Sequence, residues 1–329
     1  MRPLALLALL LAPAYAAGPL LVERAEPLRF ALASEQVGLH LAALALEPAG
    51  ELAEAAELEH WPLFAGSLER RDAGLYRRLE QALRRAGQWA RQRDAARLRA
   101  SLGANLVLLE QARQALIPRE LRADAAFQAA LLAQLVEAAA EGYEEAAEGE
   151  EGAYRLGWGA LQRARVLWGR LEPSLRGREA TPRVAQGLEA LAALLPSPAP
   201  PARFRDPEDA ERASLDVAFA LEAAVRTPLL PRELPPLVAL VRRQTEQACQ
   251  AARSGPGRLA LEHAAAARFY YRAHLADPLG ALEPALGDRL GALLQDSLPA
   301  AIRAGGTARV GAACEQTLGA LEAAGGVLR

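Results

Sequence analysis

The chain has 329 residues, 52% of them apolar and 24% charged, so it is long enough for two or three globular units and too apolar for a disordered chain. Its formal net charge of −2 gives no electrostatic reason to expect nucleic acid or an anionic membrane as a partner. The apolar residues are mostly Ala and Leu, and every basic residue is Arg. These residue types favour helices over strands, so the composition predicts an all-α protein.

Residues 1–16 have the organisation of a cleavable export signal. Met1-Arg2 provides a positive start, Leu4–Ala12 is an apolar run too short to span a bilayer, and Ala14–Ala16 matches an A-x-A cleavage signal. We therefore expect a periplasmic or secreted protein that begins near Ala17. No later apolar stretch is long enough to predict a transmembrane anchor.

Apolar residues recur at helical spacing through the rest of the chain, with breaks at Pro and Gly. The helical groups follow one another with a period of roughly 100 residues, which is longer than that of common solenoid repeats. We predict tandem antiparallel helical bundles, as about three diverged four-helix repeats. The repeats would cover residues 17–117, 118–226 and 227–329.

The sequence also predicts where some helices begin and end. Asp206 followed by Pro207 is typical of a helix start, because Asp caps free backbone N–H groups and Pro is tolerated in the first turn. Gly149 is predicted to lie in a turn between two long helices. Helical groups are expected to run from Leu28 to Leu116, from Arg119 to Val225 and from Glu233 to Ala324.

The first repeat contains a candidate metal site. Glu57 and His60 have the Glu-x-x-His spacing that helical bundles use to bind metal ions, because i and i+3 share a helix face. His40 and Glu47, two turns apart on the preceding helix, are the predicted facing pair. Imidazole and carboxylate ligands together suit iron, zinc or copper better than calcium. The alternative is a solvated acidic face, with Pro62 bending the helix after His60.

The other repeats offer weaker candidates. In the second, Glu137, Glu141, Glu144 and Glu148 form a stripe that in most proteins is a solvated face. In the third, the two histidines are eleven residues apart, about 16 Å along a helix, so they are not expected to share an ion. We find no phosphate loop, nucleophile elbow or His-Glu-x-x-His motif, so we do not expect an enzyme.

The chain has two cysteines, Cys249 and Cys314. In an oxidising compartment they are candidates for one disulfide, which would close a long loop and stabilise the fold by about 4 kcal/mol. Two buried free thiols are the alternative.

Several segments resemble a known family. They are Leu131–Trp168 with its Gly149 turn, the helix and Pro-rich link at Gly187–Pro198, and the Leu39–Pro48 and Glu57–Phe64 stretches. Together they resemble the helical extracytoplasmic region associated with bacterial oxidase-coupled high-affinity iron permeases. The resemblance implies a part of an iron-uptake system that acts with a membrane permease.

Carried over by position, the resemblance implies Glu47, Glu57 and Glu141 as metal-binding acids, with His60 where the family more often has an acid. The chain departs from the family at Arg155-Leu156, where polar and acidic residues are usual. A weaker similarity is to imelysin-like periplasmic proteins, whose signature includes Gly-x-His-x-x-Glu. Gly38-Leu-His40 matches the opening of this signature, but Ala43 stands where the Glu should be.

Three hypotheses follow. The first is an all-helical protein of an iron-uptake system at the cell envelope, which binds iron or partners a permease. The second is a metal-free helical scaffold for protein–protein interaction at the cell envelope, which predicts that the imidazoles of His40 and His60 are more than about 10 Å apart. A helical metallopeptidase is the third, without a motif to support it.

Overall fold

The computed structural model of the chain describes residues 20–49, 56–254 and 257–329, and no strand occurs among them. Helices pack in contacting pairs throughout, so the predicted all-α bundle fold is confirmed. The predicted export signal, residues 1–16, lies outside the described residues. In the part of the chain that the structure describes, no helix is both long and apolar enough to cross a membrane.

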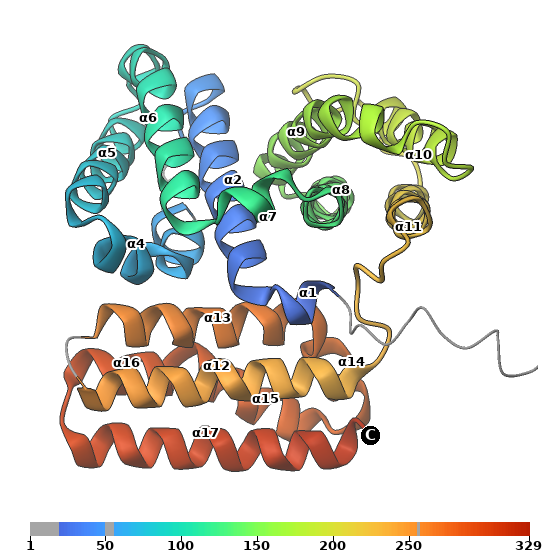
Figure 1. Ribbon diagram of the computed structural model, residues 1–329. Coiled ribbons are helices and arrows are strands. Elements are labelled where there is room, and N and C mark those ends of the chain that lie inside the picture. The colour runs from blue at the N-terminus through green and yellow to red at the C-terminus, as the bar shows by residue number, and fades with distance from the viewer. Residues whose placement is uncertain (1–19, 50–55, 255–256) are drawn as a thin grey trace, which may run out of the picture.

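The first group of helices is built around α2, which packs against α6 (Figure 1). Helix α5 packs on both α4 and α6. Asp72 and Asp94 cap α5 and α6, each accepting a hydrogen bond from a backbone N–H of the first turn. The elements are α1 (Leu20–Glu23), α2 (Ala25–Leu46), η1 (Ala56–His60), η2 (Trp61–Leu63), α4 (Ala65–Arg71), α5 (Ala73–Arg91) and α6 (Ala95–Leu116).

The predicted helix across Glu57 and His60 is different in the structure. Ala56–His60 forms a π turn and Trp61–Leu63 a single 3₁₀ turn. The physical reason is Pro62, which has no N–H to donate and disfavours an α-helical residue before it. The regular α-helix expected here is therefore interrupted just after His60.

In the second group, α8 packs against both α9 and α11, and α10 packs against α11. Gly142 and Gly157 let α8 and α9 approach closely, since a Cβ on Gly142 would lie 2.8 Å from the Gly157 Cα. The turn between these helices contains Gly149 at φ 114°, a conformation that L side chains rarely adopt. The elements are α7 (Arg119–Ala123), α8 (Ala125–Ala147), α9 (Glu151–Leu175), α10 (Thr181–Leu194) and α11 (Pro207–Val225).

The third group forms the lower part of the molecule in Figure 1. Helix α12 packs between α13 and α17. Cys249 of α12 and Cys314 of α17 form a disulfide, with their Cα atoms 6.0 Å apart. The elements are α12 (Leu234–Ser254), α13 (Arg258–His274), α14 (Ala276–Leu282), α15 (Pro284–Ala292), η3 (Leu293–Ser297), α16 (Leu298–Ala304) and α17 (Thr307–Val327).

The apolar core is divided unevenly among the groups. The first two groups share one continuous cluster of buried residues, whereas the third is built around two further clusters, one of which also includes Ala25 of α2. Helix α13 connects the lower and upper parts, because it packs against α4 and η2. The π turn therefore lies near the place where all three groups meet.

Candidate metal-binding cleft

His40 and His60 lie side by side in the structure. Their ring centroids are 4.9 Å apart and the ring planes are inclined by 53°. His40 is buried on α2, and His60 ends the π turn that packs against the same helix. Metal–nitrogen bonds of 2.0–2.1 Å place two imidazoles on one ion with centroids about 5 Å apart. The spacing of this pair therefore allows both rings to bind the same ion.

A backbone hydrogen bond sets the tautomer of His40. Its Nδ1 lies 2.8 Å from the carbonyl oxygen of Gln36, one helical turn earlier. Because a carbonyl oxygen only accepts, Nδ1 carries the proton and Nε2 carries the lone pair. Histidines that bind metals are held in this way by a second hydrogen bond from the other ring nitrogen.

Both imidazoles are neutral at pH 7. Burial lowers the pKa of His40 below its ordinary value of 6.5, and the Gln36 hydrogen bond offsets this only in part. For His60, burial lowers the pKa to about 3, with smaller contributions from His40 and the positive charge of Arg268. Neutral imidazole is the form that binds metal ions.

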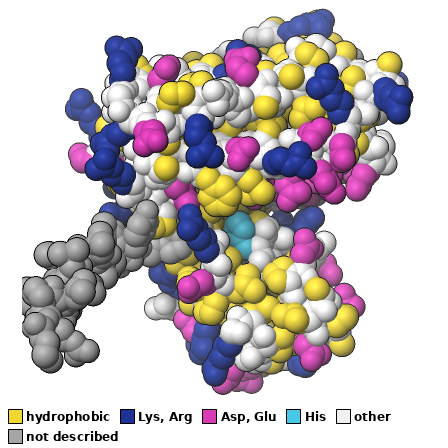
Figure 2. All heavy atoms as spheres, turned by 90° about the vertical axis from the view of Figure 1, so that its right-hand side faces the viewer, with side chains coloured by type: hydrophobic (Ala, Val, Ile, Leu, Met, Phe, Trp, Pro, Cys, Tyr) yellow, Lys and Arg dark blue, Asp and Glu magenta, His cyan; other side chains and the backbone are white. Residues whose placement is uncertain are grey.

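The two rings line a cleft of about 930 Å³ between the first two groups and the end of α13. Its walls come from α2, the π turn, α8, the Gly149 turn and the start of α9. One basic side chain, Arg272, is among the described lining residues. The acidic lining residues are Glu59, Glu141, Glu145 and Glu150. Figure 2 shows acidic side chains gathered along one edge of the upper part, above a narrow waist in which a histidine is visible.

The acids on α8 are crowded. Burial, followed by the negative charge of Glu144, raises the pKa of Glu141. Burial and the nearby charges of Glu150 and Glu141 likewise raise the pKa of Glu145. Glu137, one turn before Glu141, has its pKa raised to about 7 by burial and by Glu141. A bound cation would relieve both the repulsion and the desolvation of these carboxylates.

The residues predicted as ligands are only partly brought together. Glu141 lines the same cleft as the two histidines, whereas Glu47 is absent from the lining and pairs with Arg155. The side chain of Glu57 lies outside the described part of the structure. Among the described side chains, no three His, Cys, Asp or Glu are close enough together to hold an ion. The described side chains therefore supply a two-histidine site with carboxylates farther away.

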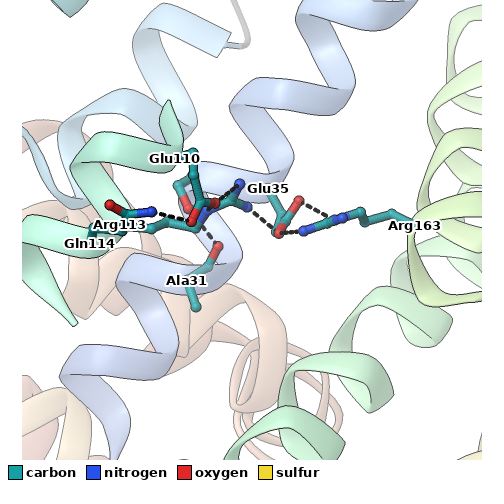
Figure 3. A network of polar contacts seen from close by, with 7 residues as sticks. Ala31, Glu35, Glu110, Arg113, Gln114 and Arg163 are labelled. Carbon is teal, nitrogen blue, oxygen red and sulfur yellow. Dashed lines mark hydrogen bonds and ion pairs between the residues drawn. The ribbon is translucent and has the colours of Figure 1, made fainter. Parts of the chain in front are cut away.

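A polar clamp fixes the helix that carries His40 (Figure 3). Glu35 of α2 accepts two hydrogen bonds from Arg163 of α9, both at 2.8 Å, and another from Arg113 of α6. Glu110 in turn accepts a hydrogen bond from Arg113. Because Gln36 follows Glu35 directly, the clamp also positions the carbonyl that holds the His40 ring.

Sequence reasoning missed several residues of this region. Glu35, Arg113 and Arg163 belong to three different helices, and no local spacing connects them. Glu59 belongs to an acidic run in the sequence, a pattern typical of a solvated face, yet it lines the cleft. For Arg272 the only signal was its position near the end of an amphipathic helix, which is common to many surface arginines.

Chemically, a pair of neutral imidazoles beside carboxylates suits a borderline divalent metal ion such as Fe²⁺ or Zn²⁺. Comparison with protein-family models, curated proteins and solved structures finds no significant match to this chain.

Proposed function

We propose that this protein binds a divalent transition-metal ion between His40 and His60, as an extracytoplasmic member of an iron-uptake system. The observation that carries the proposal is the 4.9 Å separation of the two ring centroids, which suits two ligands of one ion. The fixed tautomer of His40 supports it, since Nε2 keeps a lone pair without any rearrangement.

The acidic lining supports the same proposal through electrostatics. The carboxylates of Glu59, Glu141 and Glu145 attract cations into a cleft whose described lining has a single basic side chain, Arg272. Carboxylates at the edge of the site also provide additional ligands after small side-chain movements. Weak, partly hydrated binding of this kind suits a protein that passes its ion on.

The location rests on two features. The first residues have the pattern of an export signal, and Cys249 is paired with Cys314 in a disulfide. Disulfides persist mainly in oxidising compartments such as the periplasm. We therefore place the protein at the cell envelope, where a membrane iron permease is the partner that the sequence resemblance implies.

A metal-free scaffold accounts for the helical bundles equally well, but it gives no reason for two neutral imidazoles to lie 4.9 Å apart. The scaffold hypothesis expected these rings to be more than about 10 Å apart. The observed separation of 4.9 Å therefore favours the metal hypothesis.

The proposal is tested by calorimetric titration of the purified chain with Zn²⁺ and, without oxygen, with Fe²⁺. We expect His60→Ala to weaken binding by about tenfold or more, because the site loses one of its two imidazoles. His263→Ala is the matched control, since His263 is also a half-buried histidine of low pKa but does not line the cleft. Equal binding by wild type and His60→Ala would refute the proposal.

A spectroscopic measurement separates direct coordination from an indirect effect. Co²⁺ bound by imidazole nitrogen should give visible absorption bands that differ from those of the hydrated ion. These bands should disappear in His60→Ala and remain in His263→Ala. Bands that persist in His60→Ala would mean that the ion binds elsewhere.

A further inference from the structure

A second cleft of about 720 Å³ lies away from the histidine pair. It is formed by the first turns of α2, the C-terminal ends of α4 and α6, and the short helix α7. Its lining residues are different from those of the histidine cleft at every position. The inference drawn from it therefore does not depend on metal binding.

The charge of this cleft is opposite to that of the first. Arg70 and Arg71 close α4, while Arg119 and Arg122 come from α7. One carboxylate, that of Glu26, is among the described lining residues together with these four arginines. The chain as a whole has a net charge of −2, so this concentration of positive charge is local.

One lining residue of the cleft, Ser67, is held in place by a buried network. Both the backbone N–H and the hydroxyl of Ser67 donate to Glu262, each at 2.7 Å. Arg29 donates to the same carboxylate at 3.1 Å. The α4 segment that continues to Arg70 is thereby fixed before any ligand arrives, which lowers the entropic cost of binding.

One arginine is already oriented within the cleft. The Nε of Arg122 donates to the carbonyl oxygen of Ile117 at 3.1 Å. A guanidinium group has five N–H donors, so this bond leaves the terminal nitrogens free to bind a ligand. Arg side chains recognise phosphate and carboxylate groups through paired N–H donors.

We propose that this arginine-lined cleft binds a small multivalent oxyanion, either a polyphosphate or a polycarboxylate. A single monovalent anion cannot bind to all four guanidinium groups, which come from two helices. The volume falls within the range of small-molecule sites, which is roughly 300–1,000 Å³. Because one arginine pair is on α4 and the other on α7, a ligand with two or more anionic groups can bind to both helices.

The test is calorimetric titration of the full chain with pyrophosphate and, separately, with citrate at low ionic strength. We expect a dissociation constant below about 1 mM for at least one of them, and weaker binding of acetate. The stronger of the two ligands identifies the class. If neither pyrophosphate nor citrate binds below this limit, the proposal is wrong.

Two variants assign the binding to this cleft. Arg70→Gln/Arg119→Gln removes one guanidinium from each helix and should weaken binding by about tenfold or more. Arg84→Gln/Arg85→Gln removes the same charge from the exposed face of α5 and should leave binding within about twofold. If the two double variants lose the same amount of affinity for the anion, only the net charge of the protein matters and the proposal is overturned.

A third variant gives a change in the opposite direction. Glu26→Gln removes the one carboxylate among the described lining residues, so it should tighten binding several-fold. This gain cannot result from misfolding, which would only reduce binding. Unchanged or weaker binding in a folded Glu26→Gln protein contradicts the proposal.

Discussion

Arg29 of α2 donates a hydrogen bond to Glu262 of α13 at 3.1 Å, and the two side chains are only 1% and 0% exposed. The pair joins the first group of helices to the third, 233 positions later in the chain. Ser67 adds two further donors to the same carboxylate. A buried charge pair with this many hydrogen bonds fixes how the lower part of the molecule meets the upper part.

Glu262→Gln should therefore destabilise the protein strongly. The change leaves the guanidinium of Arg29 buried without its counter-charge, which costs about 3–5 kcal/mol of unfolding free energy. Urea denaturation followed by circular dichroism measures the loss. Glu246→Gln is the control, because Glu246 pairs with Arg242 at the surface and its loss should cost less than about 1 kcal/mol. Similar losses in the two variants would contradict this role for Glu262.

Local signals predicted the helices well. The helices expected to end at Leu116 and Val225 do so, because a Pro follows each of them within three residues, Pro118 and Pro228, and Pro stops a helix through backbone geometry alone. Asp206 caps α11 as predicted, accepting a hydrogen bond from the N–H of Glu208, and Pro207 begins the helix. These features depend on neighbours a few positions apart, which is the range that sequence patterns report.

The candidate cleft was only partly predictable. The proximity of His40 and His60 followed from their places on two consecutive segments, but the π turn that positions His60 did not. The ion pair between Glu47 and Arg155 depends on how α2 and α9 pack, which no local spacing encodes. The same holds for the contact of Arg29 with Glu262. Long-range polar contacts are decided by tertiary packing, so the sequence named candidate ligands without showing which of them would meet.

The acid sensitivity of the fold should depend on His60. In the unfolded chain this histidine is protonated below about pH 6.5, whereas the folded protein keeps it neutral down to about pH 3. Between these values the unfolded state binds more protons, so the unfolding free energy falls as pH falls, by about 1.4 kcal/mol per unit. Glu137 acts in the opposite sense, since its raised pKa of about 7 favours the folded state at low pH.

Comparison of wild type with His60→Gln isolates the histidine contribution, because Glu137 is present in both. Urea denaturation at pH 7 and at pH 5 gives the change in unfolding free energy between these pH values for each protein. We expect the unfolding free energy of wild type to fall by about 2 kcal/mol more than that of the variant. An identical pH dependence in the two proteins would mean that His60 is not buried as a neutral ring.

The disulfide should contribute substantially to stability. Cys249 and Cys314 are 65 positions apart, and closing a loop of this length stabilises the fold by roughly 4 kcal/mol in the chain-entropy model. We expect the double variant Cys249→Ala/Cys314→Ala to unfold at lower urea concentration than the oxidised protein. Thiol titration of the unreduced protein in denaturant is the direct check, and two reactive thiols there would show that the bond is absent.

The close approach of α8 and α9 should be intolerant of even one methyl group. A Cβ on Gly142 would lie 2.7 Å from the carbonyl oxygen of Ala153 and 2.8 Å from the Gly157 Cα, and backbone atoms cannot move aside as a flexible side chain does. Gly142→Ala should therefore force the helices apart and cost about 1–3 kcal/mol of unfolding free energy.

Gly169 on α9 provides the matched control, since a Cβ there meets nothing within 4 Å. Gly169→Ala should raise the unfolding free energy by about 0.5–1 kcal/mol, because Ala favours the helix more than Gly does. The same substitution is thus expected to lower the unfolding free energy at Gly142 and to raise it at Gly169.

Because Gly142 also lines the histidine cleft, Gly142→Ala should weaken metal binding as well, whereas Gly169→Ala should leave it unchanged. If both variants are more stable than wild type, α8 and α9 are farther apart in the protein than in the structure.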